Sequence, residues 1–242
     1  MIFNDTPVRN GSPYNREFYL NTWAQIVNAC HRDAVPDTWG IGDHKQMIVG
    51  DQVYNVEIIG RKHDTYAAGG KAPLTFQIVE LWREGSSRSF YMNQDASAEG
   101  GWSKTYMRNQ TLSRILAQLP SEIQQGIRAV HKQSSVFYYS TQSWELETTA
   151  DKLFLLSEYE VFGRNYFAAL AEGQQYALWR SKSISYEGCR KVVQGYTAPA
   201  EWSLRSAATD APRDSFSIIS DYGDVTIRKA NIDAGVSFAF CF

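Results

Sequence analysis

The clearest pattern of apolar and polar positions lies near the C-terminus, where short apolar runs alternate with turn residues. Residues 235–242 (Gly-Val-Ser-Phe-Ala-Phe-Cys-Phe) form a dense apolar run, which is typical of a strand paired inside a sheet. Residues 215–220 and 225–228 flank the segment Asp-Tyr-Gly-Asp, whose glycine tolerates positive φ, and this predicts a hairpin. Large and small residues also alternate over 202–206. The last part of the chain is therefore predicted to be a small antiparallel sheet closed by the C-terminal strand.

The first third of the chain combines one helix with a strand hairpin. Apolar residues recur at helical spacing over 22–32, and Gln25 stands three residues after Thr22, as a capping box requires. Residues 45–49 and 52–59 flank Gly50 and Asp51, a two-residue connection that favours a tight hairpin. A third strand is predicted over 74–82.

The middle of the chain mixes short helices and strands. A helix is predicted to begin at Ser103 and to continue to residue 116, and strands are predicted over 127–137 and 153–156, with polar residues 139–151 between them. Further helical turns are predicted over 157–161 and 170–182. Residues 1–17 are polar and contain two prolines, which is typical of an extended arm. We therefore expect an N-terminal arm (1–17) and a single α+β domain (18–242) with a mainly antiparallel sheet and a few short helices.

Composition narrows the classes of partner. The net charge is −2, without long runs of like charge, so a broad basic face for nucleic acid is not expected. Three cysteines, far apart and without CxxC spacing, are typical of reduced thiols that behave as small hydrophobic side chains in a protein made in a reducing cytoplasm. No apolar stretch is long enough to span a bilayer, and the N-terminus has no signal-peptide pattern, so neither membrane insertion nor secretion is expected.

The sequence offers little catalytic chemistry. The four histidines are scattered without the spacing of a zinc site, and no nucleophile or phosphate-loop motif is present. Asp221, Asp224 and Asp233 cluster near the predicted hairpin, but they match no calcium-loop spacing, and aspartate is common in turns. We therefore predict no catalytic residues, no metal and no cofactor, and we expect that the protein is not an enzyme.

Two local arrangements indicate structural roles. Ser157 and Glu160 have capping-box spacing after the apolar run 153–156. Trp202 and Arg205 lie three residues apart on a predicted strand and so point to opposite faces. Trp202 is expected to anchor the core, while Arg205 is expected to reach a carboxylate or a carbonyl group.

Four motifs follow one another along the chain: Gly-Trp-Ser at 101–103 continuing to Arg108 and Leu112, Asp-Lys-Leu-Phe-Leu-Leu-Ser at 151–157 with Glu160, Trp-Ser-Leu-Arg-Ser at 202–206, and the strand 235–240. Together they resemble an uncharacterised domain family of gut bacteria and their tailed phages, over roughly residues 40–242. That family is similar to the C-type-lectin-like fold, which formylglycine-generating enzymes and variable receptor-binding proteins of phages also use. Formylglycine-generating activity would require paired reactive cysteines, which Cys189 and Cys241 do not provide.

The resemblance implies a binding module of C-type-lectin-like fold. We expect a non-enzymatic component of a phage virion, in a tail or fibre, that is made in the bacterial cytoplasm and recognises a host-surface glycan or protein. Two alternatives remain open: a structural decoration or assembly protein of the capsid or tail that docks through its N-terminal arm, and a bacterial surface binding module, which the lack of a signal peptide disfavours. The expected partners are other virion proteins and further copies of the chain in a homo-oligomer.

The recognition site is predicted on the loops beside the terminal sheet. Its residues are Asp221, Tyr222, Asp224, Arg228 and Asn231. Turn residues stand outside the strand ladder, the hairpin supports them rigidly, and this mixture of tyrosine with polar side chains can stack on a ligand and hydrogen-bond to it. Ordinary turn chemistry explains the same composition, so the alternative is a turn without a binding role.

Overall fold

The computed structural model describes residues 13–210 and 212–242. The helices are α1 (Trp23–His31), α2 (Gly101–Lys104), α3 (Leu112–Gln118), α4 (Ser121–Gly126), α5 (Glu158–Phe162), α6 (Ala177–Lys182) and α7 (Tyr186–Cys189), with a 3₁₀ turn at Phe18–Leu20 and a π-helical turn at Met107–Thr111. The strands are β1 (His44–Val49), β2 (Gln52–Arg61), β3 (Leu74–Ile78), β4 (Val130–Tyr138), β5 (Ser143–Asp151), β6 (Leu153–Phe154), β7 (Lys191–Val192), β8 (Pro199–Ala200), β9 (Trp202–Ala207), β10 (Ser215–Ile219), β11 (Val225–Lys229) and β12 (Ala239–Cys241). The protein is thus α+β, with mainly antiparallel sheets and a few short helices, as predicted.

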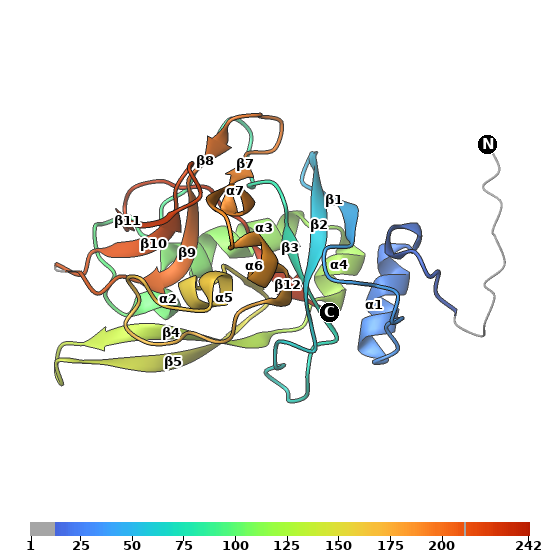
Figure 1. Ribbon diagram of the computed structural model, residues 1–242, viewed down its shortest axis with the longest axis horizontal. Coiled ribbons are helices and arrows are strands. Elements are labelled where there is room, and N and C mark those ends of the chain that lie inside the picture. The colour runs from blue at the N-terminus through green and yellow to red at the C-terminus, as the bar shows by residue number, and fades with distance from the viewer. Residues whose placement is uncertain (1–12, 211) are drawn as a thin grey trace.

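A five-stranded antiparallel sheet in the order β1-β2-β3-β12-β6 forms the centre of the fold (Figure 1). The C-terminal strand β12 lies inside this sheet, between β3 and β6, and Phe240 stacks on Phe76 with ring centroids 5.4 Å apart. The prediction that the last strand is paired in a sheet is confirmed. Its assignment to the terminal sheet was wrong, because the flat apolar faces of Phe238 and Phe240 are buried against the distant strand β3 and its neighbours.

The terminal hairpin forms a separate three-stranded sheet in the order β11-β10-β9. β10 and β11 pair with Ile219 opposite Val225, so residues 220–224 form the connection that the sequence predicted. Trp202 on β9 is fully buried and stacks near Trp179 of α6 at 5.7 Å, which confirms its predicted role as a core anchor.

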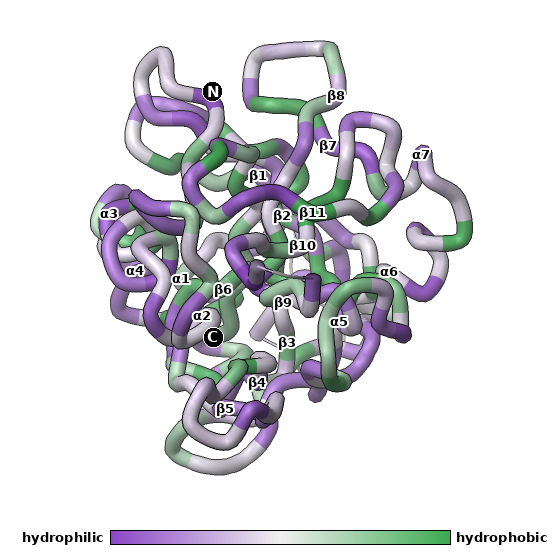
Figure 2. Tube along the Cα trace, turned by 90° about the vertical axis from the view of Figure 1, so that its left-hand side faces the viewer, coloured by the Kyte–Doolittle hydropathy of each residue, from purple (hydrophilic) through white to green (hydrophobic). Residues whose placement is uncertain are grey.

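A long hairpin, β4–β5, forms the lower edge of the molecule in Figures 1 and 2. The sequence predicted residues 139–151 as a polar connection, but most of them form β5, which pairs with β4 from Val130–Asp151 to Tyr138–Ser143. The prediction failed because only two of the nine residues of β5 are buried, so its composition is polar although each of its residues pairs with β4.

Local patterns correctly predicted several other elements. The capping boxes at Thr22–Gln25 and Ser157–Glu160 both form, and the β1–β2 hairpin turns at Gly50 and Asp51. The helix predicted from residue 103 is instead interrupted: it divides into α2, a π-helical turn and α3.

The predicted N-terminal arm lies mostly outside the described residues, which begin at residue 13. Tyr14 and Asn15, however, already contact the domain. The Tyr14 side chain is 4 % exposed and its hydroxyl donates to Asn28 Oδ1 at 2.7 Å, while Trp39 Nε1 donates to the Asn15 carbonyl at 2.9 Å. Packing against the domain therefore begins before residue 18.

The three cysteines are free, as predicted, and all three are buried. Burial raises the pKa of the Cys241 thiol well above its usual range, and the neighbouring Asp64 carboxylate adds to this effect. Among the described residues, no helix combines the length and the apolar character that crossing a membrane requires.

Candidate functional site

The predicted recognition residues Asp221, Tyr222 and Asp224 share the connection between β10 and β11. The Tyr222 ring is 69 % exposed, whereas Gly223 is buried and has φ of +93°. The side chain of Asp224 accepts a hydrogen bond from the Ser220 hydroxyl and so stabilises the turn. Of these three residues, Asp221 and Tyr222 are exposed to solvent, and Asp224 is half-buried.

Arg228 and Asn231 lie farther along the same hairpin. Arg228 forms a bidentate ion pair with Glu201, in which Nε donates to Oε2 at 2.9 Å, and the hydrogen bonds that it donates to Glu201 raise the pKa of the guanidinium group. Asn231 is exposed after the end of β11. Arg228 is therefore already paired within the protein, whereas Asn231 stands at the surface beyond the strand.

The tertiary structure brings α7, which carries a second exposed tyrosine, beside the β10–β11 turn. Tyr186 at the start of α7 is 68 % exposed, and its carbonyl oxygen lies only 1.8 Å from the position that a Cβ on Gly223 would occupy. Arg190 Nε donates to the Tyr222 carbonyl at 3.1 Å, which further ties α7 to the turn. We call the exposed residues Tyr186, Asp221 and Tyr222 the tyrosine surface. Sequence reasoning missed Tyr186, because no local pattern links α7 to a turn that follows much later in the chain.

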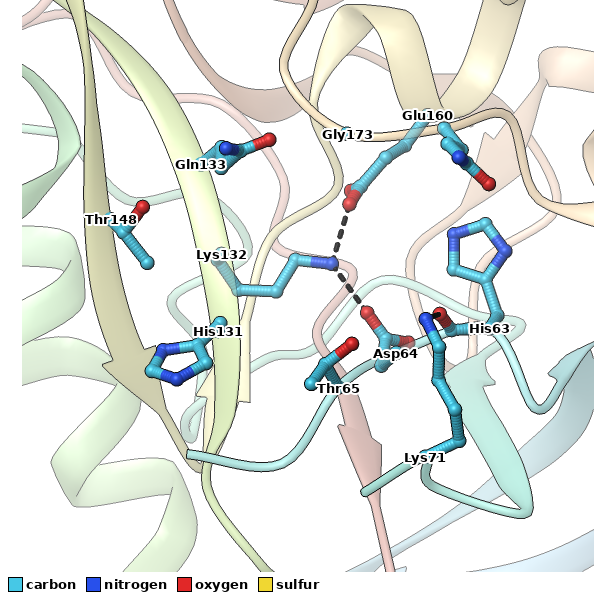
Figure 3. A pocket seen from close by; sticks show the side chains of 11 residues that line it. His63, Asp64, Thr65, Lys71, His131, Lys132, Gln133, Thr148, Glu160 and Gly173 are labelled. Atoms are coloured by element: carbon cyan, nitrogen blue, oxygen red, sulfur yellow. Dashed lines mark hydrogen bonds and ion pairs between the residues drawn. The ribbon is translucent and has the colours of Figure 1, made fainter. Parts of the chain in front are cut away.

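A cluster of buried charges lies elsewhere, where β4 meets α5 and the loop before β3 (Figure 3). Lys132 Nζ donates to Asp64 Oδ1 at 2.8 Å, to Tyr176 Oη at 3.0 Å and to Glu160 Oε1. Asp64 Oδ2 accepts further hydrogen bonds from Thr75 and Tyr176. All three hydrogens of the ammonium group therefore have acceptors.

Arg205 joins this cluster from β9 and is fully buried. Its Nη1 donates to Glu160 Oε2 and to the Leu155 carbonyl at 2.9 Å, and its other nitrogens donate to the carbonyls of Gln133 and Glu172. The prediction that Arg205 reaches a carboxylate or a carbonyl group is confirmed, and it reaches both.

The charges in the cluster balance one another. Burial alone would raise the pKa of Asp64, but the Lys132 ammonium and its hydrogen bonds outweigh burial and lower that pKa to about 2. Burial likewise opposes ionisation of Glu160, yet Arg205 and Lys132 lower its pKa. Two carboxylates thus face two cations. From the sequence, only the capping box at Glu160 and the orientation of Arg205 pointed towards this cluster.

His63, Asp64 and Glu160 are the described residues whose ligand atoms lie close enough together to hold a metal ion, within 4.8 Å. The Lys132 ammonium already binds one oxygen of each carboxylate, and a cation placed there would meet its positive charge. The arrangement therefore favours an internal ion-pair cluster over a metal centre.

A cleft of about 420 Å³ opens over this cluster. Its lining comprises residues of the loop before β3, of the β4–β5 hairpin, of α5 and of the segment after it: His63, Asp64, Thr65, Lys71, His131, Lys132, Gln133, Thr148, Glu160, Gly173 and Gln174. The cleft and the tyrosine surface share no residue.

Comparison with protein families shows to which family the chain belongs. Residues 75–242 match the family described as Domain of unknown function (DUF6273), and the chain belongs to this family. The matched region includes the tyrosine surface, Arg205 and Glu160, and it begins after Asp64. Comparisons with curated proteins and with solved structures found no match.

Proposed function

We propose that this protein is a non-enzymatic recognition domain of a tailed-phage particle, built on a C-type-lectin-like fold, that binds a host-surface glycan or protein through the tyrosine surface. The observation that carries this proposal is that two exposed tyrosines, Tyr186 and Tyr222, belong to backbone segments that contact each other, α7 and the β10–β11 turn. Tyrosine supplies a large contact area at low conformational cost, which suits a binding surface.

The phage context of this proposal rests on the resemblance of the four sequence motifs to a domain family of gut bacteria and their tailed phages. A non-enzymatic role agrees with the state of the reactive groups in the described chain. The cysteines are buried, burial raises the pKa values of all three thiols, and the Lys132 ammonium has its three acceptors within the protein.

The test is binding of the labelled protein to a panel of gut bacteria and to arrays of their surface polysaccharides. The double variant Tyr186→Ala/Tyr222→Ala is expected to lose binding without a change in melting temperature. Tyr139→Ala is the matched control, because Tyr139 is 50 % exposed but lies at the tip of the β4–β5 hairpin. Undiminished binding by the folded double variant would place the recognition site elsewhere.

A structural assembly role is the second candidate. Ile48 and Val53 oppose each other across the β1–β2 hairpin and are 56 % and 42 % exposed, which supports a contact with another particle protein. Ile48→Ser/Val53→Ser should then abolish incorporation into particles while host binding by the isolated protein persists. Normal incorporation of this folded variant would count against the assembly role.

A further inference from the structure

The cleft over the charged cluster is lined by polar and charged residues. Its eleven lining residues are hydrophilic side chains and one glycine, without an aliphatic or aromatic hydrocarbon side chain among them. Its volume of about 420 Å³ lies within the range of roughly 300 to 1,000 Å³ that is typical of small-molecule sites. A ligand of this cleft must therefore satisfy the hydrogen bonds of these polar side chains.

The floor of the cleft is electrically balanced and internally paired. Lys132 is 2 % exposed and donates three hydrogen bonds, while Asp64 and Glu160 accept from Lys132, Tyr176, Thr75 and Arg205. The two carboxylates and two cations sum to zero formal charge. An anionic ligand would meet both carboxylates, and a cationic ligand would meet Lys132 and the ammonium of Lys71 at the rim.

The uncharged side chains around this floor are available to a ligand. Thr65, Gln133, Thr148 and Gln174 make no side-chain hydrogen bond to any other residue that the structure describes. Gln133 and Thr148 are directly opposite each other on β4 and β5. Hydroxyl and amide groups both donate and accept, so they match a ligand that presents several hydroxyl groups.

The imidazole of His63 adds a ring at the edge of the cleft. It stacks on Tyr176 with centroids 4.0 Å apart, and burial lowers its pKa, although Asp64 partly opposes this shift. Two glycines permit this packing. A Cβ at Gly60 would lie 3.0 Å from both His63 Cβ and Tyr176, and a Cβ at Gly173, where φ is +98°, would lie 3.0 Å from Glu160 Oε1. The walls of the cleft are thus held close to the floor.

We propose that this cleft is a second binding site, separate from the tyrosine surface, for an uncharged, hydroxyl-rich ligand about the size of one or two sugar units. The ligand is bound by the amide and hydroxyl groups of Gln133, Thr148, Thr65 and Gln174. The paired charges beneath it hold the walls in place and do not contact the ligand as free ions.

The test is an NMR titration of the full-length protein with the methyl glycosides of glucose, galactose, mannose and N-acetylglucosamine, following the ring resonances of His63 and His131. At least one glycoside is expected to give saturable shifts. Gln133→Ala/Thr148→Val should weaken that binding about tenfold or more, since each lost hydrogen bond changes affinity severalfold. Gln174→Ala is the second, independent variant and should also weaken it. Tyr186→Ala/Tyr222→Ala is the matched control and should leave the titration unchanged.

The proposal would be overturned if none of the four glycosides gave a saturable shift up to roughly 50 mM, a range in which even weak sites fill. Unchanged binding by both folded cleft variants would also overturn it. The third contrary result is tighter binding of glucose 6-phosphate or glucosamine than of methyl glucoside. The outcome is independent of the proposed function. Loss of cell binding in the tyrosine variant tests the tyrosine surface alone, whereas the glycoside titration tests the cleft alone.

Discussion

Glu160 of α5 and Arg205 of β9 form a buried ion pair between residues 45 positions apart in the sequence, with side chains 2 % and 0 % exposed. Glu160 Oε1 accepts a hydrogen bond from Lys132 of β4. Glu160 Oε2, which accepts from Arg205, also accepts from the Ser157 amide in the capping box. One carboxylate thus connects a helix N-terminus with two strands of different sheets. Removal of one partner from such a cluster leaves an uncompensated buried charge.

Arg205→Met should therefore be strongly destabilising. We expect the free energy of unfolding, measured by urea denaturation, to fall by about 3 to 5 kcal/mol, because the substitution leaves Glu160 with one cation and removes donors from buried carbonyls. Arg228→Ala is the control: it breaks the more exposed pair with Glu201 and should cost less than about 1 kcal/mol. Equal losses for the two variants would contradict the role assigned to the cluster.

Acid should weaken the fold through the same carboxylates. The pKa of Asp64 is about 2 in the folded protein against 3.8 for the free side chain, and that of Glu160 is also lowered. A group whose folded pKa is depressed stabilises the fold above its unfolded pKa, and this contribution is lost as the pH falls through the folded value. Stability measured by urea denaturation should therefore decline from about pH 4 towards pH 2, and Asp64→Asn should flatten this decline.

The contribution of Glu172 to stability should have the opposite pH dependence. Burial raises its pKa, which Arg205 only partly offsets, so its contribution is greatest below its unfolded pKa and is lost as the pH rises through the folded pKa. Glu172→Gln keeps an acceptor for the Ser135 amide, which donates at 2.6 Å, and removes the cost of ionising a buried carboxyl group. This variant should thus gain stability relative to the parent on going from pH 4 to pH 8. A relative loss over that interval would contradict the assignment.

The C-terminal strand should be essential to folding. Phe238 is fully buried beside β3 and packs near Phe240 at 6.3 Å, so Phe238→Ala is expected to cost about 3 to 5 kcal/mol in thermal or urea unfolding. Tyr222→Ala, at an exposed position, should change stability by no more than about 0.5 kcal/mol. Cooperative unfolding of a soluble chain that ends at residue 233 would show that β12 is dispensable.

Two N-terminal deletions should differ in their effect on the melting temperature. Removing residues 1–12, the first part of the predicted arm (1–17), is expected to leave the melting temperature unchanged and to weaken assembly with partner proteins. Removing residues 1–17 should lower the melting temperature, because it also removes the buried Tyr14 ring, which lies 6.0 Å from Trp39. Differential scanning calorimetry would separate the two effects, and an equal loss in both deletions would extend the domain to residue 1.

Sequence by itself determined the elements whose cause is local. The β1–β2 turn at Gly50 and Asp51, the two capping boxes and the β10–β11 hairpin depend on residues that are near neighbours in the chain, so the pattern was sufficient. Trp202 and Arg205 contact different neighbours, Trp179 and Glu160, which agrees with the opposite faces expected from the two-residue period of a strand.

Only the tertiary structure decided which distant segments meet. The apolar run around β12 suits any sheet, and its place between β3 and β6 depends on shape-matched packing over long sequence separations. β5 escaped prediction because backbone pairing with β4 defines it, while its exposed polar side chains carry no apolar period. The same holds for the sites. Tyr222 was predicted in a turn from the sequence. The position of Tyr186 beside that turn, and the Lys132–Asp64–Glu160 cluster, result from contacts between segments that are distant in the sequence.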